Sequence, residues 1–564
     1  MSNFRPFQNA TSRWVVVLLL TWGAYFLYMW STMMYETEEG LFVGTAIVWA
    51  DWVVHLGLAA IFAYRDLGDW LGQSPFYLGQ PVQYHFAVNL ISGLLLRMGF
   101  GYWTAFIVPS IITCFAFFIV LFFFYKRVLK HPGYAFFGVS FFFLNGGMGF
   151  LVSLSNLFAT HPVRQPEFVT ALPDYGIHWI SVLVSEFFPQ RALLLGFALT
   201  LPFLFILYRW VEKGFQGVAA WHAVLLGASS SFLLLAHAHS YMSFVFLCVV
   251  LSAFSLRHFW KWAYIALGAV LTLLPLYLVF MKGGASEGFF EWYPGWMANP
   301  KEKPQTGFLA FWFINWGFFL PLAVWGTIRL RLYCNPLVIG GFVLFAIVNL
   351  VKIQPWVWDN TKILTWAHLL LCIPVAAYLG HLWEQRGNLG ISIAGKSLAV
   401  IFGILVVASG AMDAWRLAEG RHDYMMFTRE ELTLADKLRR ISAVSDVVLN
   451  SFDHHHWITL TGRQQLMSYS GWLTSWGIHP DARERDVRLM YAGEPEAQQL
   501  MDRYNIRYVV LGPKERELIR PINDKYFQDR YPVVIQEGAT KIYCVTRGKI
   551  LDKTLGYQGE CSYP

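Results

Sequence analysis

The apolar run Trp14-Val-Val-Val-Leu-Leu-Leu-Thr-Trp-Gly-Ala-Tyr-Phe-Leu-Tyr-Met-Trp-Ser-Thr-Met33 opens the chain and decides its class of fold. An α-helix needs about 20 apolar residues to cross the hydrocarbon core of a bilayer, and this run has that length. Glu36, Glu38 and Glu39 follow it, where a cleaved signal peptide would have small residues. We therefore expect an uncleaved first membrane helix.

The composition of the whole chain agrees with a membrane protein. Of its 564 residues, 56% are hydrophobic and only 14% are charged, and the mean hydropathy is +0.43. A soluble domain needs more charge on its surface. The net charge of +7 falls mainly in short connections between apolar runs, which sets orientation in the membrane and does not indicate nucleic-acid binding.

Ten further apolar runs predict an all-α polytopic membrane protein with about eleven spans. The runs lie near 103–125, 132–154, 191–210, 217–236, 241–257, 261–281, 306–328, 335–351, 363–381 and 396–415. Basic residues gather in alternate connections between the runs, so the side of the membrane on which these connections lie is expected to be cytoplasmic. The N-terminus is then cytoplasmic, and the loops 34–102, 155–190, 282–305 and 352–362 are extracytoplasmic. A bacterial inner or plasma membrane is the expected location.

The composition changes near residue 412, after which charged residues are frequent. Short β-like runs at 447–449, 508–511 and 531–535 alternate with helix-like segments at 428–441 and 495–504. This predicts a catalytic membrane domain over 1–415 and a small extracytoplasmic α/β domain over 416–564. Cys544 and Cys561 lie in that second domain, and the sequence leaves open whether they pair.

The loop 34–102 follows the first span and is unusually acidic. Its first part, 34–84, has six carboxylates and one basic residue, and the stretches 44–67 and 84–98 predict two helices lying at the membrane interface. Glu36, Glu38 and Glu39 are consistent with a solvated helix end. Asp51 differs, because it interrupts an apolar helical stretch where an acid without a role would be unfavourable.

Asp51 and His55 share a helix face, and His85 follows in the second helix, after Tyr84. We predict that Asp51, His55 and His85 are catalytic, with Asp51 as a general base that His55 orients or tunes. The same three side chains leave a divalent metal open as an alternative, although the spacing is not a specific metal signature and no cofactor is firmly predicted. Asp453-His454-His455-His456 is a similarly weak metal signal.

Cations and aromatic residues occur at the extracytoplasmic ends of other predicted spans. Arg191 in Pro189-Gln190-Arg191 suits a phosphate, or alternatively lipid headgroups. The segment 352–362 combines Lys352 and Lys362 with acid, amide and Trp side chains and predicts an anion site, although its two Trp residues alone would be ordinary interfacial aromatics. His237 and His239 end the fifth span and face a cavity or pack structurally.

These motifs resemble those of the GT-C superfamily of membrane glycosyltransferases, in its poorly characterised bacterial branch. The residues that carry the resemblance are Asp51-x-x-x-His55, Pro81-Val82-Gln83-Tyr84-His85-Phe86, Pro189-Gln190-Arg191 and Trp358-Asp359-Asn360-Thr361-Lys362. The resemblance covers most of the chain in architecture and about 40 residues in motif. Many members carry an Asp-Glu pair in the first outer loop; here Trp52 follows Asp51, so Glu38 and Glu39 remain alternative bases.

The resemblance implies a polyprenyl-phosphate-linked sugar as donor and a saccharide, lipid or protein as acceptor, with no nucleic acid and with the bilayer as surroundings. It implies that Asp51 is the base and that Arg191, Lys352 and Lys362 bind the donor phosphate. The expected substrate-binding residues are Tyr84, Gln190, His237, His239, Trp358, Asp359 and Asn360. One displacement at the anomeric carbon would invert it.

Two other functions remain open at this point. A transporter or flippase of lipid-linked saccharides would use the same charges along a translocation path, and would spread polar residues towards the cytoplasmic face. A non-catalytic membrane scaffold would tolerate the loss of Asp51.

Overall fold

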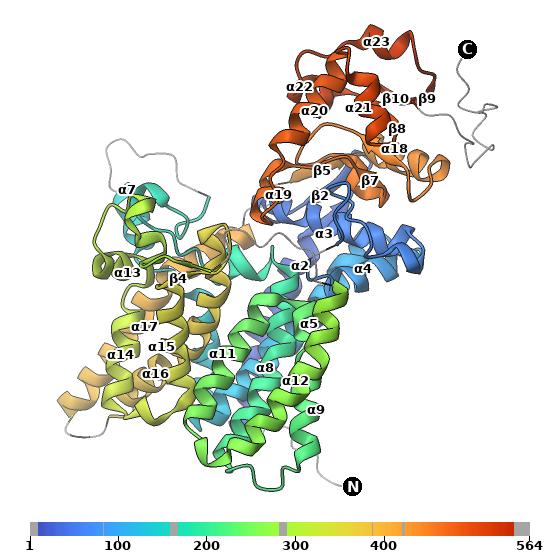
Figure 1. Ribbon diagram of the computed structural model, residues 1–564. Coiled ribbons are helices and arrows are strands. Elements are labelled where there is room, and N and C mark those ends of the chain that lie inside the picture. Colours follow the sequence, from blue (N-terminus) through green and yellow to red (C-terminus); the bar gives the residue numbers. More distant parts are fainter. Residues whose placement is uncertain are drawn as a thin grey trace, which may run out of the picture. The chain divides into compact units, whose positions relative to one another are not determined.

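The computed structural model describes residues 10–82, 84–157, 167–280, 290–385, 387, 389–419 and 423–545. The chain forms two compact units (Figure 1). The first comprises residues 1–31, 110–276 and 289–421, and the second comprises 32–109, 277–288 and 422–564.

The first unit is built from apolar helices. Its helices are α1 (Ala10–Leu18), α2 (Ala24–Thr32, ending at the unit boundary), α5 (Tyr102–Leu129, beginning in the second unit), α6 (Pro132–Leu144), α7 (Gly149–Leu157), α8 (Arg191–Glu212), α9 (Ala220–Ser230), α10 (Leu233–Ala236), α11 (Ala238–Ala253), α12 (Phe259–Phe280, ending in the second unit), α13 (Phe308–Trp316), α14 (Phe319–Arg329), α15 (Pro336–Val348), α16 (Thr361–Trp383) and α17 (Leu389–Glu419). In this unit α16 packs against α15, α14, α6 and α17, and α15 and α16 lie side by side in Figure 1. A two-stranded sheet of β3 (Glu291–Trp292) and β4 (Val351–Lys352) lies between its helices in the sequence.

The predicted class, a helical polytopic membrane protein, is confirmed, but the predicted number of eleven spans is not. Among the described residues, seven helices are long and apolar enough to cross a membrane, or up to nine if each of two bent helix pairs is one span. Every apolar run predicted as a span falls on a helix or a helix pair. Three runs give only shorter helices, and one of the seven long helices is α3 (Ala46–Tyr64), which the sequence predicts at the interface.

Helix breaks explain the difference in number. The helices α6 and α7 are bent by 66°, and α13 and α14 by 96°. Glycines with positive φ occupy both breaks, Gly147 at +65° and Gly317 at +57°, a conformation that other residues rarely adopt. The 13 residues of α15 reach only about 20 Å at 1.5 Å per residue, short of a bilayer core of about 30 Å. Mean hydropathy does not register either effect.

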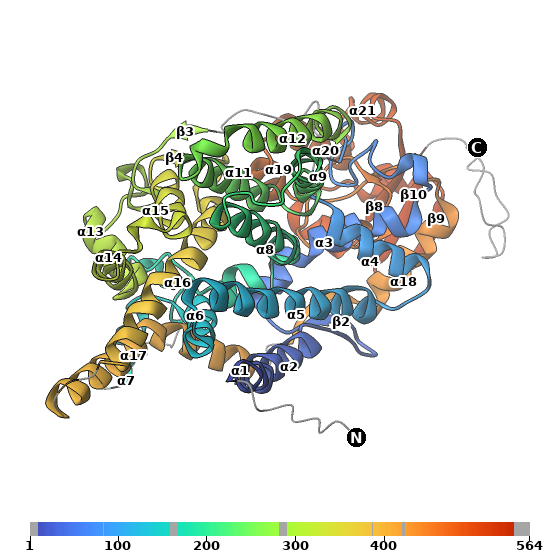
Figure 2. The same ribbon diagram turned by 90° about the horizontal axis from the view of Figure 1, so that it is seen from below.

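The second unit joins the first outer loop to the C-terminal residues. A three-stranded antiparallel sheet has the order β1 (Met34–Glu36), β2 (Gly40–Val43), β5 (Tyr424–Thr428), with Gly40 opposite Thr428. Helix α3 packs against the 3-10 helix at Trp457–Thr461, and α4 (Ala87–Arg97) lies beside α3 in Figures 1 and 2. The sequence assigns 34–102 to the membrane domain, whereas in the structure these residues share a compact unit with 423–545.

The rest of this unit is the predicted α/β fold. A five-stranded sheet has the order β7-β6-β8-β10-β9, in which β6 pairs in parallel with β7 and β8, and β10 pairs antiparallel with β8 and β9. The strands are β6 (Val447–Leu449), β7 (Gln464–Gln465), β8 (Ile506–Leu511), β9 (Val533–Glu537) and β10 (Thr540–Cys544), and the helices are α18 (Arg429–Ile441), α19 (Ser470–Ser475), α20 (Asp481–Ala492), α21 (Ala497–Arg503), α22 (Pro513–Leu518) and α23 (Asp524–Gln528). The strands and helices predicted near 447, 508, 531, 428 and 495 are confirmed. Cys544 is disulfide-bonded, and Cys561 lies outside the described residues.

Helix α3 belongs to the hydrophobic core of this unit. Its Val54, Leu58 and Ile61 are buried in one cluster with residues of the five-stranded sheet and its helices. Burying each such side chain contributes about 1.5–3 kcal/mol. Gly57 permits the close contact, because a Cβ there would lie 2.6 Å from Thr459 Cγ2. This packing fixes α3, and with it Asp51, on the C-terminal residues.

Candidate functional site

In the second unit, Asp51 lies near the start of α3. Thr45 caps this helix, and its side chain accepts a hydrogen bond of 3.2 Å from the Val48 N–H. Asp51 is half-buried, and His55, one turn later, is 2% exposed. Because residues i and i+4 share a helix face, the carboxylate precedes the imidazole on one side of α3.

A second element fixes the ring of His55. Its Nδ1 lies 2.9 Å from Oδ1 of Asn89, a fully buried residue of α4. Gly93 lets α4 approach, since a Cβ there would lie 2.6 Å from the Ala59 carbonyl oxygen. If Nδ1–H donates to Asn89, Nε2 carries the lone pair and can exchange a proton. Sequence reasoning missed Asn89, although a polar residue in the first turn of an apolar helix was a usable signal.

Tyr84 and His85 join the same region of this unit. The Tyr84 ring lies edge-on to the His55 ring, with centroids 6.4 Å apart, and its centroid is 3.9 Å from that of His85. Both residues are half-buried. The structure therefore brings together Tyr84, His55 and His85, with Asp51 one turn away on α3.

The segment 453–456 holds the beginning of α3. His455 Nε2 is 2.9 Å from the Trp49 carbonyl oxygen, and the two rings stack at 3.7 Å. Trp49 is two residues before Asp51, so this contact helps to position the acid. Burial lowers the pKa of His455 to about 3 and that of His454 to about 4.

The other histidine of this segment has a structural partner. His456 Nε2 is 2.7 Å from Glu515 Oε1, and both side chains are buried. The Ser451 hydroxyl donates to the same Glu515 oxygen at 2.9 Å. Within the described ranges, no group of three or more His, Cys, Asp or Glu side chains has a metal-binding arrangement.

In the first unit, Arg191 opens α8 and Gln190 is its N-cap residue. The Arg191 side chain is 1% exposed, and its Nε donates a hydrogen bond of 3.2 Å to Ser110 Oγ. A buried guanidinium keeps its charge at a cost in free energy unless an anion or several acceptors compensate it. The structure therefore places Arg191, predicted as a cation for the donor phosphate, as a buried residue at the start of α8.

Lys352 lies on β4 and forms ion pairs different from those of the other predicted cations. Its ammonium is 2.5 Å from Glu291 Oε2, and Lys301 lies 2.8 Å from the other oxygen of the same carboxylate. Hydrogen bonds from Lys301 and Lys352 lower the pKa of Glu291 to about 2. Any phosphate bound by Lys352 would compete with Glu291.

Lys362 also has a carboxylate partner, 2.9 Å away in Asp359, and both side chains are 13% exposed. Asn360 lies between Asp359 and Lys362 in the sequence and is buried. Its side-chain amide forms hydrogen bonds with backbone groups. Its Oδ1 accepts from the Ile353 N–H at 3.1 Å, and its Nδ2 donates to the carbonyls of Val348 and Val351 at 3.2 and 2.8 Å. Asn360 therefore shapes the segment 348–360.

His237 and His239 lie at the start of α11, and both are buried. His237 caps the helix, since its Nδ1 accepts from the Ser240 N–H at 3.2 Å. The Ser240 hydroxyl also accepts a 3.1 Å hydrogen bond from Trp366 Nε1 of α16. Lys362 interacts electrostatically with His239, so these two predicted residues lie near each other.

The predicted site residues thus fall into separate groups. The second unit holds Asp51, His55, Tyr84 and His85. In the first unit, Lys362 is close to Asp359 and His239, Lys352 is engaged by Glu291, and Trp358 contacts Trp296, with ring centroids 6.0 Å apart.

Comparison with known proteins gives structural matches only. No protein-family model and no curated protein matches the chain. The archaeal oligosaccharyltransferase AglB from Archaeoglobus fulgidus, described in complex with an inhibitory peptide and a dolichol-phosphate, is 13% identical with a TM-score of 0.45, covering 89% of this chain and 70% of its own.

ArnT from Cupriavidus metallidurans is a second match. In its apo state it is 13% identical with a TM-score of 0.46, covering 95% of this chain and 98% of its own. Bound to undecaprenyl phosphate it is 12% identical with a TM-score of 0.43 and the same coverage. These sequence identities and TM-scores are too low to assign a function to this chain.

Proposed function

We propose that the protein is a membrane glycosyltransferase that moves a sugar from a polyprenyl-phosphate donor to an acceptor hydroxyl on the extracytoplasmic face. The observation that carries the proposal is the group of Asp51, His55, Tyr84 and His85, held by α3 and the residues just before α4 in a unit whose core includes the five-stranded sheet. An acid placed on an otherwise apolar helix, next to an oriented imidazole, is suited to proton transfer.

In the proposed reaction Asp51 takes the proton of the acceptor hydroxyl. The hydroxyl oxygen attacks the anomeric carbon of the donor sugar, and the bond from that carbon to the phosphate oxygen breaks with its electron pair. Polyprenyl phosphate leaves, and the new glycosidic bond has the inverted configuration. His55, whose ring is fixed by Asn89, orients or tunes Asp51.

The charge that develops on the leaving phosphate requires donors. The proposal assigns this role first to Arg191, whose planar guanidinium suits bidentate phosphate binding in a partly dry site. Lys352 and Lys362 are secondary in the proposal, because each already pairs with a carboxylate.

The test is the Asp51→Asn variant, which keeps the shape of the side chain and removes its basicity. We expect sugar transfer to fall by at least about a hundredfold, a usual contribution of a general base, while donor binding and folding are retained. Glu38→Gln is the matched control, an exposed acid of the same loop. Transfer within twofold of the native rate in Asp51→Asn, or a loss only in Glu38→Gln, would contradict the assignment.

A further inference from the structure

A polar cavity in the second unit has no part in the proposed reaction. Its volume is about 690 Å³, within the range of about 300–1,000 Å³ that small-molecule sites occupy. It lies between the segment after α3 and the residues around the end of α18. The residues that line it are Asp66, Gly68, Asp69, Gly72, Gln73, Arg439, Ser442, Ala443, Val444, Ser445 and Arg463.

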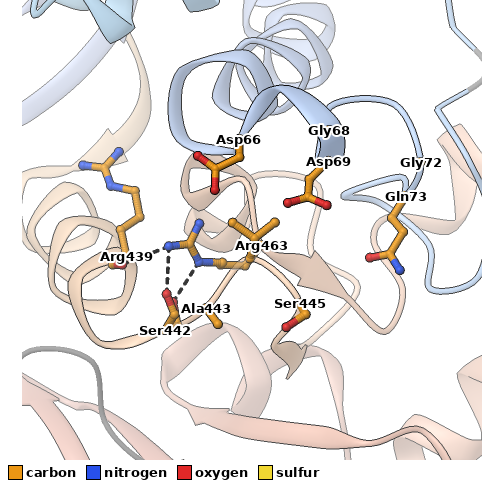
Figure 3. Close-up of a pocket in the computed structure, with 11 residues that line it drawn as sticks. Asp66, Gly68, Asp69, Gly72, Gln73, Arg439, Ser442, Ala443, Ser445 and Arg463 are labelled. Carbon is orange, nitrogen blue, oxygen red and sulfur yellow. Dashed lines mark hydrogen bonds between the residues drawn. The ribbon is translucent and has the colours of Figure 1, made fainter.

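The two sides of the cavity differ in chemistry. In Figure 3, Asp66 and Asp69 lie on one side and Ser442 and Ser445 on the other, with the guanidinium of Arg463 between them. Asp66 and Asp69 are exposed residues, and within the described part of the chain their carboxylates enter no hydrogen bond or ion pair. They are therefore available as hydrogen-bond acceptors.

Arg463 is a buried cation with only neutral partners. It is 6% exposed, and it donates to Ser442 Oγ and to the carbonyls of Arg439 and Ser442, each at 2.9 Å. A fourth contact, from Nη1 to the Thr461 carbonyl, is 3.5 Å long. A guanidinium has five N–H donors, so Nη1 retains capacity for a ligand.

The surrounding charges leave Arg463 without a direct counter-ion. Among the described residues no carboxylate forms an ion pair with it; burial lowers its pKa, Asp446 partly offsets this at longer range, and Arg439 lowers it further. Asp436 is shared by Arg439 at 2.8 Å and Arg440 at 2.9 Å. A buried guanidinium in this state is stabilised by an incoming anion.

Arg65 adds to the positive charge behind the cavity. It is 1% exposed, and its Nε and Nη1 donate to the carbonyls of Gly462 and Gln73, both at 2.6 Å. Burial is the main cause that lowers the pKa of Arg65 to about 10; Arg463 adds to this effect and the nearby Asp69 partly offsets it. Arginines therefore sit on both segments that form the cavity.

We propose that this cavity binds an acidic saccharide. A carboxylate or phosphate on the sugar is held by Arg463, and the sugar hydroxyls donate to Asp66 and Asp69 and exchange hydrogen bonds with the serines. A simple anion would bind Arg463 but would be repelled by the carboxylates of Asp66 and Asp69. A neutral sugar would leave Arg463 without a paired anion. The site is separate from Asp51, so the proposal does not depend on the proposed transfer reaction.

The test is direct binding to the full chain in lipid nanodiscs, with D-glucuronate as probe and saturation-transfer NMR as readout. We expect saturable binding of D-glucuronate and at least tenfold weaker binding of D-glucose and of inorganic phosphate. Binding by either of those two as tight as that of D-glucuronate, or no saturable binding of D-glucuronate, would overturn the proposal.

Variants identify the site. Arg463→Lys should weaken binding at least tenfold, because an ammonium cannot replace the guanidinium, whereas Arg440→Lys, at an exposed arginine of α18 that does not line the cavity, should stay within twofold. Asp69→Asn should also weaken binding, against Asp481→Asn as an exposed control at the start of α20. Equal affinity in Arg463→Lys and Arg440→Lys, with both folded by circular dichroism, would overturn the proposal.

The same assay separates this proposal from the proposed function. Asp51→Asn should bind D-glucuronate with native affinity, because Asp51 does not line the cavity. Loss of saturable D-glucuronate binding in Asp51→Asn would overturn the separation of the two sites.

Discussion

His55 and Asn89 form a buried contact between two helices, with Nδ1 of the imidazole 2.9 Å from the amide oxygen. His55 belongs to α3 and Asn89 to α4. The contact selects the tautomer and the orientation of the ring, so Asn89 is a positioning residue for His55 and, through it, for Asp51.

We expect Asn89→Leu to lower the rate constant of sugar transfer about tenfold with little change in donor affinity, because the ring loses its acceptor but keeps its packing. Asn89→Asp places a carboxylate next to the imidazole, which raises the pKa of His55 and shifts the pH profile of transfer to higher pH. The profile of each variant is the measurement. An unmoved profile in Asn89→Asp would show that His55 does not influence the reaction.

Arg191→Lys should weaken donor binding about tenfold although the charge is kept, since an ammonium cannot replace a planar two-donor guanidinium. Arg209→Lys, an exposed position on the same helix, is the control and should bind as the native protein does. Binding of a polyprenyl-phosphate analogue in nanodiscs is the measurement. Equal affinities for both variants would limit Arg191 to a structural role in the buried start of α8.

Glu291→Gln removes the carboxylate that engages Lys352 and Lys301. If Lys352 contributes to phosphate binding, this variant should bind the donor several-fold more tightly, and the gain should fall as salt is raised from low to physiological concentration. Lys301→Gln is the comparison, because it leaves the Lys352 contact in place. A donor affinity that does not change in Glu291→Gln would limit Lys352 to a structural ion pair.

Acid should destabilise the second unit through His455. Burial lowers its pKa in the folded state to about 3 from an ordinary 6.5, so below pH 6.5 the unfolded chain binds a proton that the folded chain does not. Stability is therefore lost as pH falls from about 6.5 towards 3, by about 2 kcal/mol at pH 5 for this residue.

His455→Gln can keep a donor to the Trp49 carbonyl and does not titrate, so its stability should depend less on pH. Unfolding midpoints at pH 7.5 and 5, followed by tryptophan fluorescence, measure the difference. The same fall in midpoint for the native protein and the variant would show that another group controls acid stability.

Local patterns in the sequence predict the elements well. The strand at 447–449 and the helix predicted at 428–441 follow from a β-branched run and from helical periodicity. The shared face of Asp51 and His55 also needs only the helical repeat. The number of spans was not predictable in this way, because breaks such as Gly317 are set by backbone conformation and not by mean hydropathy.

The sequence by itself determined that the chain is apolar enough to be a multi-pass helical membrane protein, that a small α/β fold follows it, and that an acid and a histidine share one face of α3. Only the tertiary structure decided that Asn89 fixes His55, that Glu291 engages Lys352, and that Arg463 lines one cavity with Asp66 and Asp69. The physical reason is range along the chain. Hydropathy and periodicity act over one element, whereas these contacts join residues from 34 to about 400 positions apart, and their energy exists only once the separate elements have packed.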